Sequence, residues 1–547
     1  MRWEKTKNSV PFLKKLTEEK NLKTFLVLVF SILFFATRLP RLANDVINPD
    51  GVLWHGRSEQ FVVGLKYQQF EKTYQHYHPG VTLMWIVGSS VEIFKQLTDI
   101  TVYNSETFMT FDLVAKSALV FVQFALSMIV IFSFSKIIGF YKSLFIVALF
   151  TFEPFFIGTS RILHLDVLSA LLVFIALIFN HQNLQKPNLF KSILVGFFLA
   201  TSFLTKSICV GAFLFVLFYN LYYFLSKKEK KNLLPVLFTT ALSFFVFTLM
   251  LFPALWKDPG YYLIDMVFGE AERVGMRGGH KQVLGGELKM DGGPFFYPII
   301  FLMKSSPFMV FGMIYYLFSG KKIGKIKDFI KSLFKKVLET DYYLGIFYLG
   351  YLVFMTVATK KIDRYIIFVF PLFSYLAVMG YEKIYDFFKK RGFINSFWWV
   401  VSTAIFAFVA IPIFRIFPWY FTYTSPVFIN TRIANGIIGQ KSFGVGVTDL
   451  KKLILEKYYE KYDEEPSLGF YDTQPIRAVY PNSKIFDVRV YGPGSYDLLV
   501  LTMNEEMPEK VIDNGRYEFI KDESIWINGL EYWRIYVKKD LREDGDV

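Results

Sequence analysis

The chain has 547 residues, 53% of them hydrophobic and 19% aromatic, and its mean hydropathy is +0.35. Apolar runs of about 20 residues recur along it, which indicates a polytopic membrane protein and excludes a soluble globular domain. The formal charge of +14 does not indicate a nucleic-acid partner, because the lysine clusters fall between apolar runs, as they do in the cytoplasmic loops of membrane proteins. The single cysteine, Cys209, excludes an intramolecular disulfide and a Cys-based zinc site.

The first apolar run, 24–35, follows a basic segment in which residues 1–23 carry seven Lys and Arg. No small-residue cleavage site follows this run, and Arg38 and Arg41 come instead. The pattern predicts a cytoplasmic basic tail over 1–23 and a retained first helix over 24–38, rather than a cleaved signal peptide.

Further apolar segments predict transmembrane helices at 113–135, 143–159, 166–181, 192–206, 207–225, 233–253, 295–318, 341–358, 364–383 and 396–417. The segment 81–94 is short for a span, so we expect it to lie on the membrane surface. With that placement the basic loops at 227–231, 321–336 and 389–391 all face the cytoplasm, whereas a spanning 81–94 would put all three outside. The sequence therefore predicts about 11 transmembrane helices over 24–417, with the N-terminus inside and the C-terminus outside.

Beyond residue 417 the long apolar runs stop and the charge rises. A helical pattern covers 450–462, and short strand patterns cover 467–471, 484–488 and 496–501. A hairpin is predicted for 517–526 and 530–537 around Asn528-Gly529, a dipeptide typical of tight β-turns. The expected fold class is an α-helical polytopic membrane protein with a small extracytoplasmic α/β domain at 418–547. The main outer loops are then 39–112, with interfacial helices, and 254–294.

Asp50 is the first candidate for chemistry. It follows Pro49 in a stretch too polar to cross a bilayer, with Trp54 and Arg57 shortly after it. A carboxylate at a membrane surface suits a general base that accepts a proton from a hydroxyl group. The alternative is that Asp50 only caps the helix that begins near Gly51.

Asp166 is the second candidate. It lies at the outer end of a span, directly before the apolar run 167–179, and Arg161 precedes it by five residues. Ionisable groups at membrane depth are costly and usually face a polar cavity. The alternative is helix capping by Asp166, with Arg161 as an interface anchor. Two acids on neighbouring outer loops favour a shared site.

Three cations stand where a phosphate could be bound. Lys206 ends a helix on the outer side, Lys304 lies inside an apolar span, and Arg364 belongs to the basic cluster 360–365. Lys and Arg bind phosphate by charge or by a bidentate fork, and a phosphate held at the outer surface would be the head of a polyprenyl lipid. Snorkelling to ordinary lipid headgroups is the alternative.

His76 and His78 stand two residues apart. They could belong to a metal site, but no companion ligand is placed by spacing, so aromatic packing and hydrogen bonding are favoured. The sequence contains no Walker loop, dinucleotide-binding fingerprint or HExxH motif, so nucleotide chemistry gains no support.

Taken in order, the motifs resemble those of the GT-C class of integral-membrane glycosyltransferases, and within it the protein O-mannosyltransferase-like and aminoarabinose-transferase-like enzymes. The resemblance covers about 24–446 and is carried by Asn48-Pro49-Asp50, His76-Tyr77-His78-Pro79-Gly80, Ser160-Arg161 with Leu165-Asp166, Leu204-Thr205-Lys206, Phe296-Tyr297 with Lys304-Ser305-Ser306-Pro307, Arg364-Tyr365 with Pro371, and Phe417-Pro418-Trp419-Tyr420. Gly51 stands where the family has a second acid, and Gly80 where it has proline. The first departure puts a metal at this loop in doubt, and a divalent cation, Mg or Mn, stays an open possibility.

The resemblance implies a polyprenyl-phosphate-linked sugar donor and an inverting transfer to a hydroxyl acceptor outside the cytoplasmic membrane. Asp50 matches the family's catalytic acid and Asp166 its second acidic position. The candidates for binding the donor phosphate are Lys206, Arg273, Lys304, Arg364 and Tyr365. The candidates for contacting substrate are Trp54, Arg57, His76, His78 and Arg161.

Two alternatives from other classes are a lipid or solute transporter without catalysis and a receptor or scaffold that uses 418–547. Transporters tend to show inverted repeats and charges at the membrane midplane, whereas here the charges gather at the outer edge and no repeat is visible. A receptor would leave the acids and cations of the other outer loops unexplained. An enzyme is therefore favoured, although neither its sugar nor its acceptor (protein, glycan or lipid) follows from the sequence.

Overall fold

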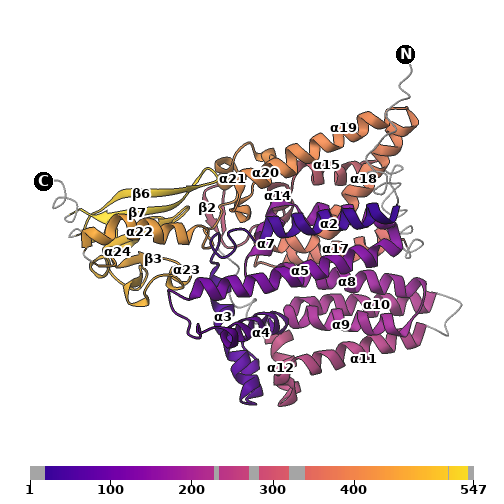
Figure 1. The fold of residues 1–547 in the computed structure, drawn as a ribbon, viewed down its shortest axis with the longest axis horizontal. Coiled ribbons are helices and arrows are strands. Elements are labelled where there is room, and N and C mark those ends of the chain that lie inside the picture. The colour runs from indigo at the N-terminus through magenta and orange to yellow at the C-terminus, as the bar shows by residue number, and fades with distance from the viewer. Residues whose placement is uncertain are drawn as a thin grey trace.

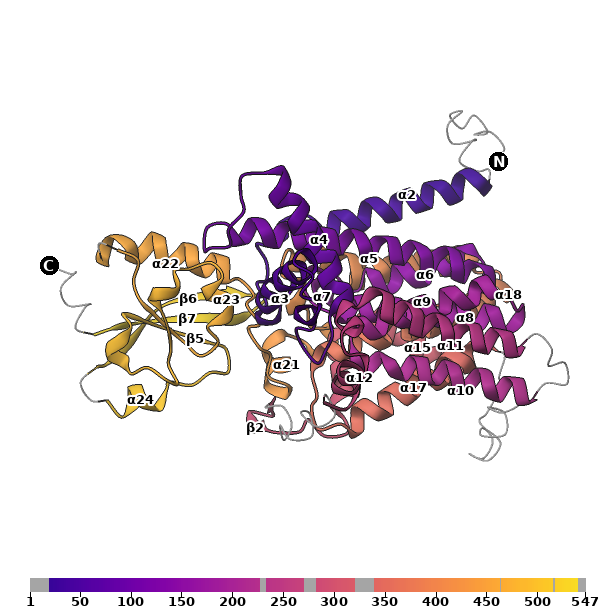
Figure 2. The same cartoon turned by 90° about the horizontal axis from the view of Figure 1, so that it is seen from below.

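Long apolar helices run side by side along most of the molecule, and a small mixed β-sheet lies at one end of them (Figure 1). The computed structural model describes residues 19–226, 233–269, 282–319, 339–462, 464–514 and 517–539. Figure 2 shows the same two parts from below, with the sheet and its helices set beyond the end of the bundle. The chain thus has the predicted fold class, a helical membrane protein with a small C-terminal α/β region.

Within the described residues, seven helical segments are long and apolar enough to cross a membrane, which makes the chain a multi-pass membrane protein. They are Glu19–Arg38 (α2), Phe108–Ile138 (α5), Asp166–Gln185 (α8), Ser207–Leu225 (with α10, Val210–Ser226), Leu234–Leu251 (in α11, Leu233–Leu251), Asp363–Lys390 (η5, Asp363–Val369, and α18, Phe370–Lys390) and Ile394–Ile416 (α19, Ile394–Ile405, to α20, Ile411–Ile416).

The other four predicted spans are also helical, but two of them are interrupted. α6 (Phe140–Thr151) and α7 (Pro154–Arg161) form a pair bent by 69°, and α14 (Phe296–Lys304) is separated from α15 (Pro307–Phe318) by Ser305-Ser306. Proline at the start of α7 and α15 lacks an amide hydrogen, so it suits the first turn of a new helix. The remaining two are α9 (Leu189–Thr205) and α17 (Thr340–Val357). All eleven predicted segments are helical, while the number that crosses the membrane stays a prediction.

Two helices of the loop 39–112 position the site. α3 (Pro49–Lys66) and α4 (Val81–Leu97) pack against each other, and α4 also contacts α5 and α9. With α12 (Pro259–Ile264) they gather at the end of the bundle nearest the sheet, whereas the start of α2 and the turn between α18 and α19 lie at the opposite end (Figure 1). The surface segment predicted at 81–94 is therefore helical.

The C-terminal sheet has five strands in the order β4-β3-β5-β7-β6. β3 (Leu468–Phe470) is parallel to β4 (Ile485–Asp487) and β5 (Leu498–Thr502), and β7 (Leu530–Lys538) is antiparallel to β5 and to β6 (Phe519–Ile527). β6 and β7 form the predicted hairpin, and Asn528 and Gly529 at its tip have φ of 47° and 81°, as a tight turn of this kind requires.

Smaller elements complete this region. α22 (Val447–Tyr462) lies along the sheet (Figure 2) and confirms the helix predicted at 450–462. The others are β1 (Gln282–Leu284), β2 (Glu287–Lys289), α21 (Thr431–Ile437), α23 (Gln474–Arg477) and α24 (Glu509–Ile512). Each predicted strand is also confirmed.

Candidate active site

Asp50 lies in the first turn of α3, at the end of the bundle nearest the sheet. The helix begins at Pro49, and its N-cap residue is Asn48. The Asn48 side chain donates from Nδ2 to the carbonyl oxygen of Leu163 at 3.2 Å, which ties the start of α3 to the segment between α7 and α8. The Asp50 carboxylate remains 42% exposed. Asp50 is therefore not the helix cap, and its carboxylate is accessible.

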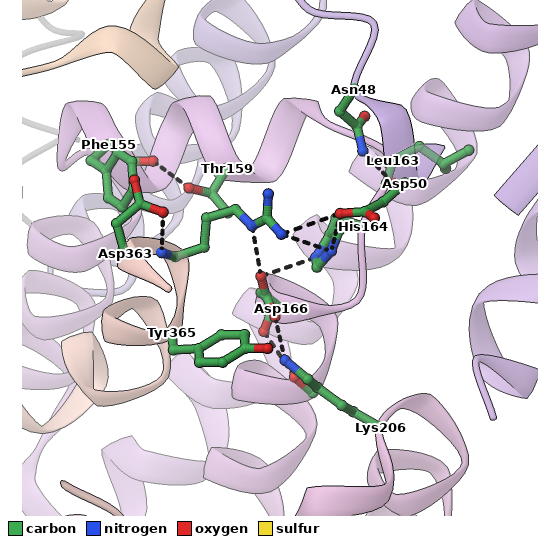
Figure 3. Close-up of polar contacts among 12 residues, drawn as sticks. Asn48, Asp50, Phe155, Thr159, Leu163, His164, Asp166, Lys206, Asp363 and Tyr365 are labelled. Atoms are coloured by element: carbon green, nitrogen blue, oxygen red, sulfur yellow. Dashed lines mark hydrogen bonds and ion pairs between the residues drawn. The ribbon is translucent and has the colours of Figure 1, made fainter. Parts of the chain in front are cut away.

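Asp166 is the first residue of α8, and only 5% of its side chain is exposed. Lys206 follows α9, and its Nζ lies 2.8 Å from Asp166 Oδ1. The same ammonium lies 4.1 Å from the centre of the Tyr365 ring. Lys206 is thus held by a carboxylate and an aromatic face and does not extend to lipid headgroups (Figure 3).

Arg364 and His164 connect the two carboxylates, and Figure 3 shows His164 between Asp50 and Asp166. Arg364 Nη2 donates to Asp50 Oδ2 at 3.2 Å, and Arg364 Nε lies 3.5 Å from Asp166 Oδ2. His164 lies between the same acids, with Nε2 3.3 Å from Asp50 Oδ2 and Nδ1 2.9 Å from Asp166 Oδ2. The structure therefore brings both candidate acids and two candidate cations into one cluster, although they are far apart in sequence.

The charges of this cluster shift the pKa values of its loop members. Burial alone would raise the pKa of Asp50, but the hydrogen bond and charge of His164 and the charge of Arg364 outweigh burial, so this pKa lies well below the ordinary value. Burial would lower the pKa of His164, but the neighbouring Asp166 and Asp50 outweigh it and raise this pKa. Asp50 is thus ionised at physiological pH, and the two carboxylates favour a protonated His164.

Four candidates for substrate contact, Trp54, Arg57, His76 and His78, pack together on α3 and in the loop after it. Arg57 stacks over the Trp54 ring at 4.6 Å, and the His76 ring meets Trp54 edge-on at 6.2 Å between centroids. The His76 and His78 rings lie 5.6 Å apart, and His78 Nδ1 lies 3.3 Å from the Ser207 hydroxyl oxygen. The predicted aromatic packing of the two histidines is confirmed.

Two predicted site residues of the described ranges, Arg161 and Lys304, bond elsewhere in the protein. Arg161 is buried, with Nε 2.6 Å from Asp45 Oδ2 and its terminal nitrogens donating to the carbonyl oxygens of residues 37, 38 and 40. Lys304 is also buried and donates to the carbonyl oxygen of Tyr423 at 3.0 Å. The buried donors of Arg161 and Lys304 thus bond to the protein itself, and neither bonds to Asp50 or Asp166; their roles in binding substrate and phosphate stay predictions. Arg273 lies outside the described residues.

His164 belongs to the cluster although the sequence analysis gives it no role. Its signal is its place two residues before Asp166, at the same polar edge between two apolar runs. Three further buried side chains fix α3 to α5. His55 Nε2 lies 3.1 Å from Asp112 Oδ1, and Lys116 Nζ lies 2.5 Å from Asp112 Oδ2 and donates to the carbonyl oxygen of Val46 at 2.7 Å.

The donor set of the cluster suits an anionic ligand. Across the described ranges, no group of three or more His, Cys, Asp and Glu side chains is arranged to hold a metal ion. Asp166 is engaged by three cationic side chains, and Asp50 by two of them. Such an arrangement can bind a phosphate through Lys and Arg and can accept a proton at Asp50.

Comparison with known proteins gives structural matches only. No family model and no curated protein sequence matches the chain. The structure is similar to ArnT from Cupriavidus metallidurans bound to undecaprenyl phosphate, with a TM-score of 0.50 and 13% identity, over 95% of this chain and 99% of that one. It matches apo ArnT equally, with a TM-score of 0.50 and 14% identity over 94% and 98% of the two chains.

An oligosaccharyltransferase from Archaeoglobus fulgidus is matched with a TM-score of 0.46 and 13% identity, over 86% of this chain and 65% of that one. Likeness at such identities shows the fold alone. The chain has a GT-C-type membrane fold, the class that the order of its motifs predicts. Because the match to ArnT covers nearly all of both chains, it includes the C-terminal region as well as the bundle.

Proposed function

We propose that the protein is an inverting glycosyltransferase. It would move a sugar from a polyprenyl-phosphate donor to a hydroxyl acceptor on protein, glycan or lipid, at the outer face of the cytoplasmic membrane. The observation that carries the proposal is the accessible, ionised Asp50 carboxylate beside Arg364 and the buried Lys206–Asp166 pair. The GT-C-type fold, shared with a protein whose solved structure holds undecaprenyl phosphate, supports it.

Asp50 is the general base in this reaction. The acceptor hydroxyl gives its proton to Asp50, and its oxygen attacks the anomeric carbon from the face opposite the phosphate. The bond from that carbon to the phosphate oxygen breaks, and its electron pair leaves with the phosphate, so the configuration inverts. Arg364 donates a hydrogen bond to Asp50, which places its guanidinium to neutralise the phosphate as charge develops there.

Binding of the donor would also make Asp50 a better base. Without substrate, His164 and Arg364 keep the pKa of Asp50 below its ordinary value. A phosphate that attracts Arg364 would weaken this contact, and the pKa of Asp50 would rise. Proton transfer is most effective when the pKa of the base approaches the working pH, so the rise favours the acceptor step once the donor is bound.

Asp166 acts as a positioning residue rather than by contact with substrate. It is nearly inaccessible, and Lys206, Arg364 and His164 all lie within 3.5 Å of its carboxylate. It therefore holds these three side chains in place, and two of them, His164 and Arg364, also contact the accessible acid Asp50. The clustering of charges at one end of the bundle also favours an enzyme over a transporter, for which charges near the membrane midplane are typical.

The test is transfer by purified Asp50→Asn from synthetic polyprenyl-phosphate sugars. General-base catalysis contributes ~10²–10⁴-fold, so turnover should fall by about that factor while donor binding is retained. Asp99→Asn is the matched control, because Asp99 is an exposed aspartate of the same outer loop. Mass spectrometry of surface glycans and glycoproteins, with and without the gene, identifies the sugar and the acceptor. Transfer by Asp50→Asn at the wild-type rate would show the assignment to be wrong.

A further inference from the structure

A segment of the C-terminal region, residues 443–446, runs alongside residues 45–47, which lead directly into α3. The amide of Ile47 donates to the carbonyl oxygen of Gly444 at 3.1 Å, and the amide of Gly446 donates to that of Asp45 at 3.0 Å. Residues 46 and 445 between them form an antiparallel bridge. Since Asp50 follows Ile47 by three residues, this pairing determines where α3 begins and where its carboxylate lies.

The pairing requires glycine at position 444. Gly444 has φ of 74°, and a Cβ added to it would lie 1.9 Å from the carbonyl oxygen of Ile47. Any side chain would therefore push the two segments apart as well as strain the backbone. The close approach depends on this one residue.

Phe443, the preceding residue, contacts Arg364, which donates a hydrogen bond to Asp50. Its ring lies 4.1 Å from Arg364 Cζ and stacks on the Phe421 ring, with 5.2 Å between centroids and 20° between planes. The guanidinium is thus held between an aromatic face and the carboxylates of Asp50 and Asp166. Phe443 thereby fixes the plane in which Arg364 reaches Asp50.

The same segment is attached to the sheet. Trp533 of β7 donates from Nε1 to the carbonyl oxygen of Val445 at 2.9 Å. The C-terminal region therefore pairs through its backbone with residues 45–47, which lead to Asp50. It also contacts Arg364, which donates to Asp50 at 3.2 Å, through an aromatic ring.

We propose that residues 443–446 are a positioning element, through which the C-terminal region holds Asp50 and Arg364 in register. Gly444 sets the start of α3, and Phe443 sets the plane of the guanidinium. Neither residue meets the reacting atoms, so losing the element acts through Asp50 and Arg364. It lowers kcat, and it raises the KM for the donor because Arg364 is placed to bind the donor phosphate. This kinetic consequence rests on the proposed function. The effect on the positions of Asp50 and Arg364 does not.

The first test compares Phe443→Leu with Phe443→Tyr. Leucine keeps the apolar bulk and removes the ring, so kcat should fall about tenfold and the KM for the donor should rise. The acidic limb of kcat/KM, which reports the free enzyme, should also move to higher pH, because Asp50 loses part of the charge that keeps it ionised. Tyrosine restores the ring and should recover kcat, KM and the pH profile. Phe486→Leu is the control, because it removes a phenylalanine ring of the edge strand β4 that packs on Tyr491 and not on Arg364.

The second test measures the distance between Arg364 and Asp50 and does not depend on any enzymatic activity. In a cryo-electron microscopy structure of Phe443→Leu, the Arg364 guanidinium should have moved out of hydrogen-bond distance of Asp50, and in Phe486→Leu it should not. An unchanged contact in Phe443→Leu overturns the positioning role. A wild-type protein that transfers no sugar, together with a lost contact in Phe443→Leu, refutes the proposed reaction and leaves the positioning element supported.

Gly444→Ala tests the backbone arm of the proposal. Gly529→Ala is its control, because Gly529 also has a positive φ, of 81°, and an added Cβ there meets no atom within 4 Å. Both variants strain the chain, but only Gly444→Ala should separate residues 45–47 from 443–446. Equal kcat and equal Asp50–Arg364 distances in the two variants would contradict the proposal.

Discussion

Asp166 and Lys206 form a buried ion pair in which each charge is compensated by the other. The contact is 2.8 Å long, and 5% and 11% of the two side chains are exposed. Removing one partner of such a pair leaves an uncompensated charge and typically costs about 3–5 kcal/mol, whereas replacing both partners is often neutral. The pair therefore holds the cluster in one arrangement without making a large net contribution to stability.

Asp166→Asn should accordingly lower the free energy of unfolding by about 3–5 kcal/mol, measured by thermal unfolding in detergent. The double variant Asp166→Asn/Lys206→Met should recover part of that loss, because Lys206 is no longer an unpaired buried charge, while Arg364 and His164 still face position 166. Glu456→Gln, which breaks the exposed contact between Lys452 and Glu456, should change little. A double variant no more stable than Asp166→Asn would argue against the pair as the cause.

His164 should make stability depend on pH near neutrality. Its pKa is raised in the folded protein, so its stabilising contribution is complete below the unfolded value of about 6.5 and is lost as pH rises through the folded value. The melting temperature should therefore fall from mildly acidic to mildly alkaline pH, and His164→Asn should flatten this slope. An identical slope in the variant would assign the titration to another group.

The sequence allowed the charged members of this cluster to be selected, but not their partners. Asp166, Lys206 and Arg364 each border an apolar run, and Asp50 is an acid in the polar stretch after the first one. Arg161 has the same signal, yet its partners are Asp45 and backbone carbonyls. Only the path of the chain decides whether such a charged residue joins the cluster or bonds elsewhere.

At the scale of elements, close backbone approach decides how α18 packs on α15. A Cβ added to Gly380 in α18 would lie 2.0 Å from the carbonyl oxygen of Gly312 in α15. Small residues allow membrane helices to pack this closely. Since α18 continues the η5 segment that carries Arg364, the contact also bears on the site.

Gly380→Ala should therefore separate α15 from α18 and lower the melting temperature in detergent by several degrees. The control is Gly350→Ala in α17, where an added Cβ meets no atom within 4 Å and alanine favours the helix by ~1 kcal/mol. Equal melting temperatures for the two variants would show that the contact relaxes without loss.

The two interrupted spans show what an apolar run leaves undetermined. Segments 143–159 and 295–318 were each expected as a single helix, but both break before a proline. The breaks meet in space, because the amide of Ser306 donates to Glu153 Oε2 at 2.7 Å and its hydroxyl donates to Glu153 Oε1. Hydropathy predicts that both segments enter the membrane. It cannot predict that the two breaks contact each other, because that is a tertiary contact.

At the scale of the whole molecule, the two ends of the bundle differ in chemistry. The candidate site, α3 and the sheet lie at one end, and the turn between α18 and α19, with Lys389, Lys390 and Arg391, lies at the other (Figure 1). The sequence could predict this division from charge alone. It could not predict that residues 443–446 would pair with 45–47, because about 400 residues separate the segments.

The last prediction concerns orientation. If the basic end faces the cytoplasm, the site and the sheet face outward, where a polyprenyl-linked donor would be used. Cysteine labelling can test this against a low background, because the single native cysteine, Cys209, is buried. In right-side-out membrane vesicles, an impermeant maleimide should label Ile512→Cys on the sheet region, whose native side chain is 67% exposed. Arg391→Cys, at the opposite end, should react only after the membrane is opened. The reverse pattern would place the site in the cytoplasm and would be incompatible with a donor presented on the outer leaflet.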